Sequence, residues 1–86
     1  SDTPFSFRWA EYNANTNKYD VTLTVGTNWK AYSNGFDPAA ITWSVADTTV
    51  CTVENGVVTP LQPGITELTA VYNGVTYTCI VRIKAV

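Results

Sequence analysis

The side chains able to do chemistry in this sequence are few, and most of them are carboxylates. Seven acidic residues are available for general acid–base work, and none is paired with another within a motif: Asp2, Glu11, Asp20, Asp37, Asp47, Glu54 and Glu67. The chain has no His, which excludes His-dependent triads, His metal sites and imidazole pH switches. A domain this small is also expected to lack a cavity of roughly 300 Å³ or more, the usual size of a ligand pocket. We therefore predict a protein that is not an enzyme and has no cofactor.

Calcium binding is a related hypothesis, because oxygen-bearing side chains cluster in the predicted turns. The candidates are Asp37, Asp47, Glu54 and Asn55. No EF-hand spacing is present, and Asp or Asn in a turn more often accepts hydrogen bonds from nearby backbone N–H groups. No metal site is assigned on this basis.

The charge balance limits the partners. The chain has five Lys and Arg against seven Asp and Glu, with a net charge of −2. A generic nucleic-acid binder needs a basic stripe, which this sequence lacks. No apolar run reaches the roughly 20 residues of a membrane span. The chain has neither an initiator Met nor a signal-peptide pattern, so we expect it to be a segment of a larger protein.

Composition and hydrophobic alternation predict an all-β domain. Val, Ile, Thr, Tyr, Phe and Trp make up 40 of the 86 residues, twice the number of good helix formers. Apolar residues alternate with polar ones at period two, which predicts strands with one buried face over 5–9, 19–25, 29–33, 41–45, 51–53, 68–72 and 75–85. In the first of these, Phe5, Phe7 and Trp9 share a face. About seven antiparallel strands, each covered on one side, indicate a two-sheet β-sandwich spanning residues 1–86 as a single domain.

The connections between these strands are equally clear. Asn55-Gly56 and Asn73-Gly74 lie between alternating runs and predict type I′ hairpins, because both residue types tolerate positive φ. A polar connector is expected at 13–17, a loop turn at Pro63-Gly64, and at most one helical turn at 38–40.

Cys51 and Cys79 both point to the apolar faces of their predicted strands. Two interpretations remain open: buried free thiols that act as small apolar groups, or a disulfide that staples the sandwich. A disulfide would place the protein in an oxidising compartment. Both cysteines follow Trp43 in sequence, so the bridge would differ from that of antibody domains.

Surplus aromatic residues raise the hypothesis of a binding module. Phe, Trp and Tyr make up 13% of the chain. Tyr12, Tyr32 and Phe36 are the candidate ligand contacts, because the alternation places them off the core or in loops. Aromatic rings in such positions are enriched in recognition patches, and flat rings stack on sugars. Core packing is the alternative explanation for most of the aromatic residues.

Four ordered segments resemble one known family. They are ITWSVAD at 41–47, VCTVENGVVT at 50–59, GITELTA at 64–70 and CIVRI at 79–83, and LTVG at 23–26 precedes them. This pattern resembles the group-2 bacterial immunoglobulin-like domain over residues 19–83. The resemblance implies an immunoglobulin-like sandwich in which Trp43, Gly56, Gly64, Leu68 and Ala70 determine the fold. Residues 1–18 are atypical for the family and are expected to form an altered first strand, and the aromatic segment 27–37 also departs from its pattern.

The resemblance also implies a function and a location. Group-2 domains occur in bacterial surface adhesins, secreted enzymes and phage structural proteins, where they extend, display or attach. The expected location is therefore extracellular, on a bacterial cell surface or a phage virion. The expected partners are neighbouring domains of the parent protein, and a host or cell-wall glycan or a surface receptor in the binding alternative. Cysteine occurs in some members near the positions of Cys51 and Cys79.

Overall fold

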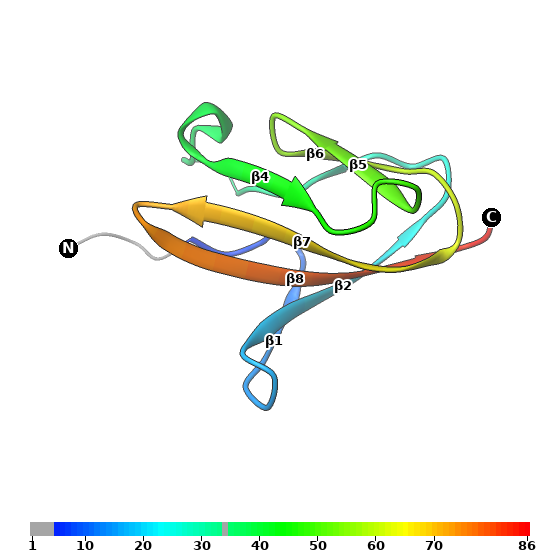
Figure 1. Cartoon of the computed structure of the whole chain (residues 1–86), viewed down its shortest axis with the longest axis horizontal. Coiled ribbons are helices and arrows are strands. Elements are labelled where there is room, and N and C mark those ends of the chain that lie inside the picture. The colour runs from blue at the N-terminus through cyan, green and yellow to red at the C-terminus, as the bar shows by residue number, and fades with distance from the viewer. Residues whose placement is uncertain (1–4, 34) are drawn as a thin grey trace.

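The computed structural model describes residues 5–33 and 35–86, which form an all-β fold of two sheets (Figure 1). Among the described residues there are eight strands, where the sequence predicts about seven. Their bounds are β1 Glu11–Asn13, β2 Lys18–Thr24, β3 Trp29–Lys30, β4 Thr42–Val45, β5 Cys51–Glu54, β6 Val57–Pro60, β7 Gly64–Tyr72 and β8 Val75–Lys84. A single 3₁₀ turn at Pro38–Ala40 follows the Asp37 cap, as predicted. Asp2, one of the candidate carboxylates, lies outside the described residues.

The larger sheet has the strand order β1-β2-β8-β7-β4, and the smaller has the order β3-β6-β5. Most neighbours are antiparallel, but β2 pairs with β8 in parallel, with Tyr19 opposite Cys79 and Thr24 opposite Lys84. The expectation of purely antiparallel sheets is therefore wrong at this pair. Parallel neighbours need a long crossover connection, and the whole chain between β2 and β8 supplies it.

One buried cluster lies between the two sheets and draws on both. Its members are Phe5, Phe7, Val21, Trp29, Ala31, Ile41, Val50, Cys51, Val58, Leu68, Ala70, Cys79, Val81 and Ile83. The alternation predicts most of these positions correctly, including Leu68 and Ala70, which are fully buried. Trp43 is half-buried against the cluster, and its indole Nε1 donates to the Pro38 carbonyl at 3.2 Å.

The two predicted Asn-Gly hairpins are confirmed. The φ angles are 50° at Asn55, 83° at Gly56, 53° at Asn73 and 77° at Gly74, as a type I′ turn requires. The polar connector at 13–17 also turns the chain, but it does so between β1 and β2, and β1 is a strand that the alternation does not predict. All three residues of β1 are exposed, so no buried face is present to produce a signal.

Candidate binding cleft

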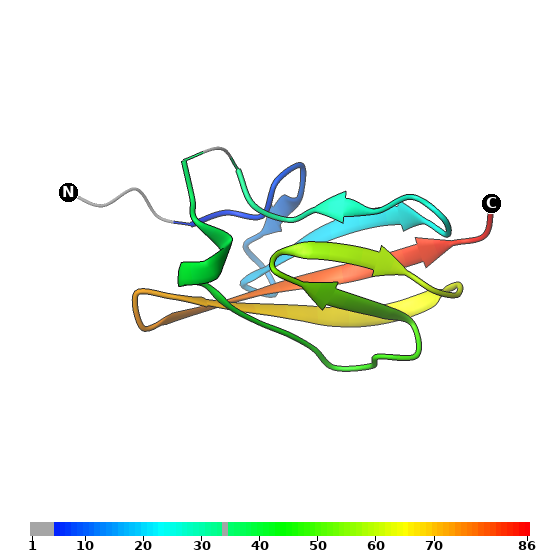
Figure 2. The ribbon, with the colours of Figure 1, turned by 90° about the horizontal axis from the view of Figure 1, so that it is seen from above.

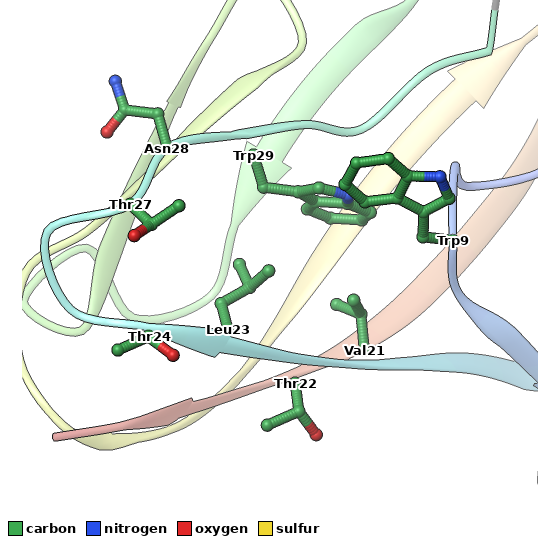
Figure 3. Close-up of a pocket in the computed structure, with 8 residues that line it drawn as sticks. All are labelled: Trp9, Val21, Thr22, Leu23, Thr24, Thr27, Asn28 and Trp29. Atoms are coloured by element: carbon green, nitrogen blue, oxygen red, sulfur yellow. The ribbon is translucent and has the colours of Figure 1, made fainter. Parts of the chain in front are cut away.

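At one side of the molecule β2 and β3 lie near each other (Figure 2). A cleft of about 300 Å³ opens there, and Figure 3 shows the residues that line it. Its lining comes from β2, from the β2–β3 connection, from the first residue of β3 and from the turn before β1: Trp9, Val21, Thr22, Leu23, Thr24, Thr27, Asn28 and Trp29. The expectation that the domain is too small for a cavity of this size is therefore wrong. The cavity forms because β2 and β3 belong to different sheets, and no strand of the described chain bridges their neighbouring edges.

Trp9 stands at the mouth of this cleft with 74% of its surface exposed. The alternation predicts that Trp9 shares a buried face with Phe5 and Phe7, and this prediction is wrong. The predicted strand over 5–9 does not form either: Phe7 makes only an isolated bridge to Tyr32, Trp9 has a φ of 65°, and the Ala10 N–H donates to the Phe7 carbonyl at 3.3 Å. The Arg8 guanidinium carbon lies 3.7 Å from the centroid of the indole, a cation–π contact.

Trp29 forms the inner wall of the cleft. It is 3% exposed, and its indole Nε1 donates to the Arg8 carbonyl at 3.1 Å. Because that hydrogen bond satisfies its only polar atom, the ring presents carbon to the cleft. Figure 3 shows Val21 and Leu23 pointing from β2 toward Trp29, whereas Thr22 points to the opposite side of the strand.

The lining has no charged side chain, which limits the chemistry that the cleft can do. Val21, Leu23 and the two indoles supply apolar surface, and Thr and Asn residues supply the remainder. A site of this kind binds an uncharged group through apolar contacts and a few hydrogen bonds. No group of three or more His, Cys, Asp or Glu side chains comes together anywhere in residues 5–33 and 35–86.

The three aromatic residues singled out in the sequence occupy other places. Tyr12 on β1 is 54% exposed, and its hydroxyl donates to Asn17 Oδ1 at 3.0 Å. Tyr32 and Phe36 are half-buried against the core. The Phe36 ring packs edge-on against Phe5 at 5.3 Å between centroids, and Tyr32 lies 6.4 Å from Trp43. None of the three lines the cleft.

The indoles that do line the cleft were missed as ligand contacts. Trp29 has the alternation of an ordinary core residue, and nothing in its sequence context separates a core indole from one that borders a cavity. A signal was available for Trp9, because the apolar alternation of residues 5–9 stops there and gives way to the polar run 11–18. Such a break indicates that the chain leaves the sheet.

The carboxylates in the turns act as backbone caps. Asp37 Oδ1 accepts the Ala39 N–H at 3.0 Å, and Asp47 Oδ1 accepts the Thr49 N–H at 3.0 Å and the Thr49 hydroxyl at 2.6 Å. These Thr49 hydrogen bonds hold the pKa of Asp47 below its usual value. Two of the four candidate calcium ligands, Asp37 and Asp47, thus already have protein partners.

Both cysteines are free thiols with no exposed surface. Cys51 lies on β5 and Cys79 on β8, so they belong to opposite sheets. The sequence leaves two interpretations open, and the structure contains the two free thiols and not the disulfide. The disulfide therefore no longer supports an oxidising compartment. Burial, with a smaller contribution from Asp20, raises the pKa of Cys79 to about 12. Burial, followed by the charge of Asp47, also raises the pKa of Cys51.

No protein-family model matches this chain, and no curated protein is recognisably similar to it in sequence. No helix in the described part of the chain is long and apolar enough to cross a membrane.

Proposed function

We propose that this chain is a non-enzymatic, immunoglobulin-like module of a bacterial cell-surface, secreted or virion protein. In this role it spaces and displays neighbouring domains and contributes to adhesion. The strand order supports the immunoglobulin-like assignment. If β2 to β8 are taken as strands A to G, then B, E and D share one sheet and C, F and G share the other, as in the immunoglobulin fold. Strand A pairs with G instead of B, and β1 is an addition before it.

The observation that carries the spacing role is the position of the two ends of the described chain. Phe5 packs against Tyr77 and Tyr72, with ring centroids 5.4 and 6.2 Å apart, beside the β7–β8 hairpin. The chain leaves after Lys84, at the other end of β8, which is ten residues or about 30 Å long. Figure 1 shows the two ends on opposite sides of the molecule. Modules joined through such ends extend in a line.

Small-angle X-ray scattering on tandem chains tests this role. Chains of one, two and three directly joined copies are compared for their maximum dimension. The long axis of one module is 41 Å, so each added copy should lengthen the particle by about that amount. A three-copy chain that is as compact as a globular protein of the same mass contradicts the spacing role.

The cleft supports a second candidate function, a carbohydrate- or receptor-binding module in the aromatic first third of the chain. The supporting observation is Trp9, because a largely exposed indole beside an apolar cavity provides the anchor surface typical of recognition sites. Titration with neutral oligosaccharides and with peptides, followed by amide chemical shifts, tests this function. Shifts confined to the cleft support it, and none at millimolar concentrations of either ligand class contradicts it.

A further inference from the structure

We infer that the edge of β2 from Val21 to Thr24 accepts an extended strand of a partner polypeptide, whose alternate apolar side chains enter the cleft between Trp9 and Trp29. This inference deepens the second candidate function above and rests on it. It names the class of receptor, an unpaired polypeptide segment bound by β-strand addition. The spacing role does not depend on it.

The edge is free because β1 stops early. Its ladder with β2 covers only Lys18 to Asp20, ending where Glu11 lies opposite Asp20. The left-handed φ at Trp9 then directs the preceding residues toward the other sheet, where Phe7 bridges Tyr32. Within the described residues, β2 beyond Asp20 has a strand neighbour only on its β8 side. A partner strand would continue the ladder that β1 begins.

The orientation of the backbone along β2 determines which N–H and C=O groups the free edge presents to a partner. The Val25 N–H donates to the Lys84 carbonyl at 3.1 Å, which places the odd-numbered amides of β2 toward β8. Successive amides of a strand point to opposite edges, so the Thr22 and Thr24 N–H groups point to the free edge. Neither has a hydrogen-bond acceptor among the described residues, and the Thr22 carbonyl has no donor there either. These groups are spaced at the repeat of a strand.

The edge also lacks the usual protection against strand addition. Natural edge strands carry charges, Pro or bulges that prevent another strand from pairing. The stretch from Val21 to Val25 reads Val-Thr-Leu-Thr-Val, with high β propensity, no charge and no Pro. An accessible segment of this kind in a folded domain is suited to pairing with a partner.

The cleft gives this edge its selectivity. A strand added beside Val21 and Leu23 would direct every second side chain inward, toward Trp29, because side chains alternate across a strand. The inward cavity of about 300 Å³ has an uncharged and partly apolar lining, so it favours inward side chains that are uncharged and largely apolar. The Trp9 indole lies at the rim and would cover the bound strand.

Two other occupants fit the edge less well. A second copy presenting its own β2 could pair its backbone, but its Val21 and Leu23 pack against its own core and are not free to enter the cleft. A sugar would have few side-chain partners here, because Figure 3 shows Thr22 and Asn28 pointing away from the cavity, which leaves Thr24 and Thr27 as its polar lining.

The test uses the whole chain and a soluble synthetic peptide, Lys-Thr-Val-Thr-Val-Thr-Lys with blocked ends. We expect saturable amide shifts at Thr22 and Thr24 and slower hydrogen exchange of the Thr22 amide on binding. The same peptide N-methylated at its Thr residues, whose N–H groups would face β2 in the antiparallel ladder, cannot donate to that edge and should bind at least tenfold more weakly. Thr22→Pro removes the edge N–H without touching the β8 ladder, and it should weaken binding at least tenfold. Thr22→Val keeps the N–H and should bind within about twofold of the natural chain. Circular dichroism melting of both variants establishes that they fold.

Each other outcome overturns the inference in a distinct way. Slow exchange of the Thr22 amide in the free protein means that the edge is already paired. Equal binding by the Thr22→Pro variant or by the N-methylated peptide means that no strand is added. If the chain dimerises as its concentration rises, and the dimer no longer binds the peptide, then the occupant of the edge is a second copy of this chain. If neutral oligosaccharides shift the cleft amides and the peptide does not bind, strand addition is wrong but the binding function proposed above still holds. Absence of binding by both ligand classes removes the binding module itself.

Discussion

Gly56 lies so close to Tyr32 that no side chain fits between them. A Cβ placed on Gly56 would be 2.6 Å from Tyr32 Cδ1 and 2.8 Å from Cε1, and 3.1 Å from Trp43 Cζ2. The Gly56 carbonyl also accepts the Ala31 N–H at 2.9 Å, so the hairpin turn is held against the chain that follows β3. The β5–β6 turn and the aromatic segment therefore pack against each other through a residue without a side chain.

Gly56→Ala should destabilise the fold by about 3 kcal/mol. About 1–2 kcal/mol comes from the positive φ of 83°, and the remainder comes from forcing Tyr32 to move. The measurement is the free energy of unfolding from urea titration. Gly74→Ala is the matched control, because Gly74 occupies the same position of the other Asn-Gly hairpin with a φ of 77° and no atom near its Cβ. Equal losses in the two variants would mean that the contact with Tyr32 carries no energy.

The two tryptophans of the cleft should differ sharply in their effect on stability. Trp29 is 3% exposed, so Trp29→Ala should cost about 3–5 kcal/mol through the cavity it leaves, and Trp29→Phe should cost less. Trp9 is 74% exposed, so Trp9→Ala should change the free energy of unfolding by less than about 1 kcal/mol. Urea titration of the three variants checks this. A large loss for Trp9→Ala would show that Trp9 supports the fold and is not a surface available for recognition.

The sequence predicts the interior of this molecule better than its edges. Burial of Val21, Leu68 and Cys79 follows from period-two alternation, because a pleated strand with one covered face leaves that pattern in the residue types. The Asn-Gly turns are predicted for the same reason, because their conformation depends on two adjacent residues. The parallel pairing of β2 with β8 is not local, since fifty residues (25–74) separate the two strands and their alternation is the same for either direction.

The cleft was not predictable from the same patterns. It depends on where β1 ends and where the chain crosses from one sheet to the other, and a single positive φ at Trp9 decides both. A non-glycine residue adopts that conformation only when its surroundings favour it, so local propensity gives no indication of it. The sequence therefore predicts Trp9 as the last residue of a buried strand, whereas in the structure it lies in an exposed turn.

The buried thiol of Cys79 should make the fold sensitive to alkaline pH. Burial raises its pKa to about 12 in the folded chain, whereas an unfolded cysteine ionises near pH 8.5. The unfolded state therefore loses its proton first, and stability falls as the pH rises from about 8.5 toward 12. Urea titrations at pH 7 and pH 10.5 should show this loss, and Cys79→Ala should show a smaller one. An unchanged pH dependence in Cys79→Ala would contradict the assignment.

Alkylation with iodoacetamide checks the state of both cysteines independently. In the native protein both thiols should react slowly, because each is buried and protonated at neutral pH. In denaturant without a reductant, mass spectrometry should record two additions per chain. No addition until a reductant is supplied would show that Cys51 and Cys79 are bonded to each other in the isolated protein.

The turn that begins at Asp47 should lose stability in acid. Its carboxylate accepts the Thr49 N–H and hydroxyl, and these hydrogen bonds lower the pKa of Asp47 in the folded chain. Its contribution is therefore present above the ordinary pKa of an aspartate, near 4, and is lost as the pH falls through the lowered value. Asp47→Ala should lower the melting temperature at pH 7 and leave a shallower decline between pH 5 and pH 2. Thr49→Val removes the hydroxyl but keeps the backbone N–H, so its effect should be intermediate. If the melting temperatures of Asp47→Ala and of the natural chain fall by the same amount from pH 7 to pH 2, the capping role is contradicted.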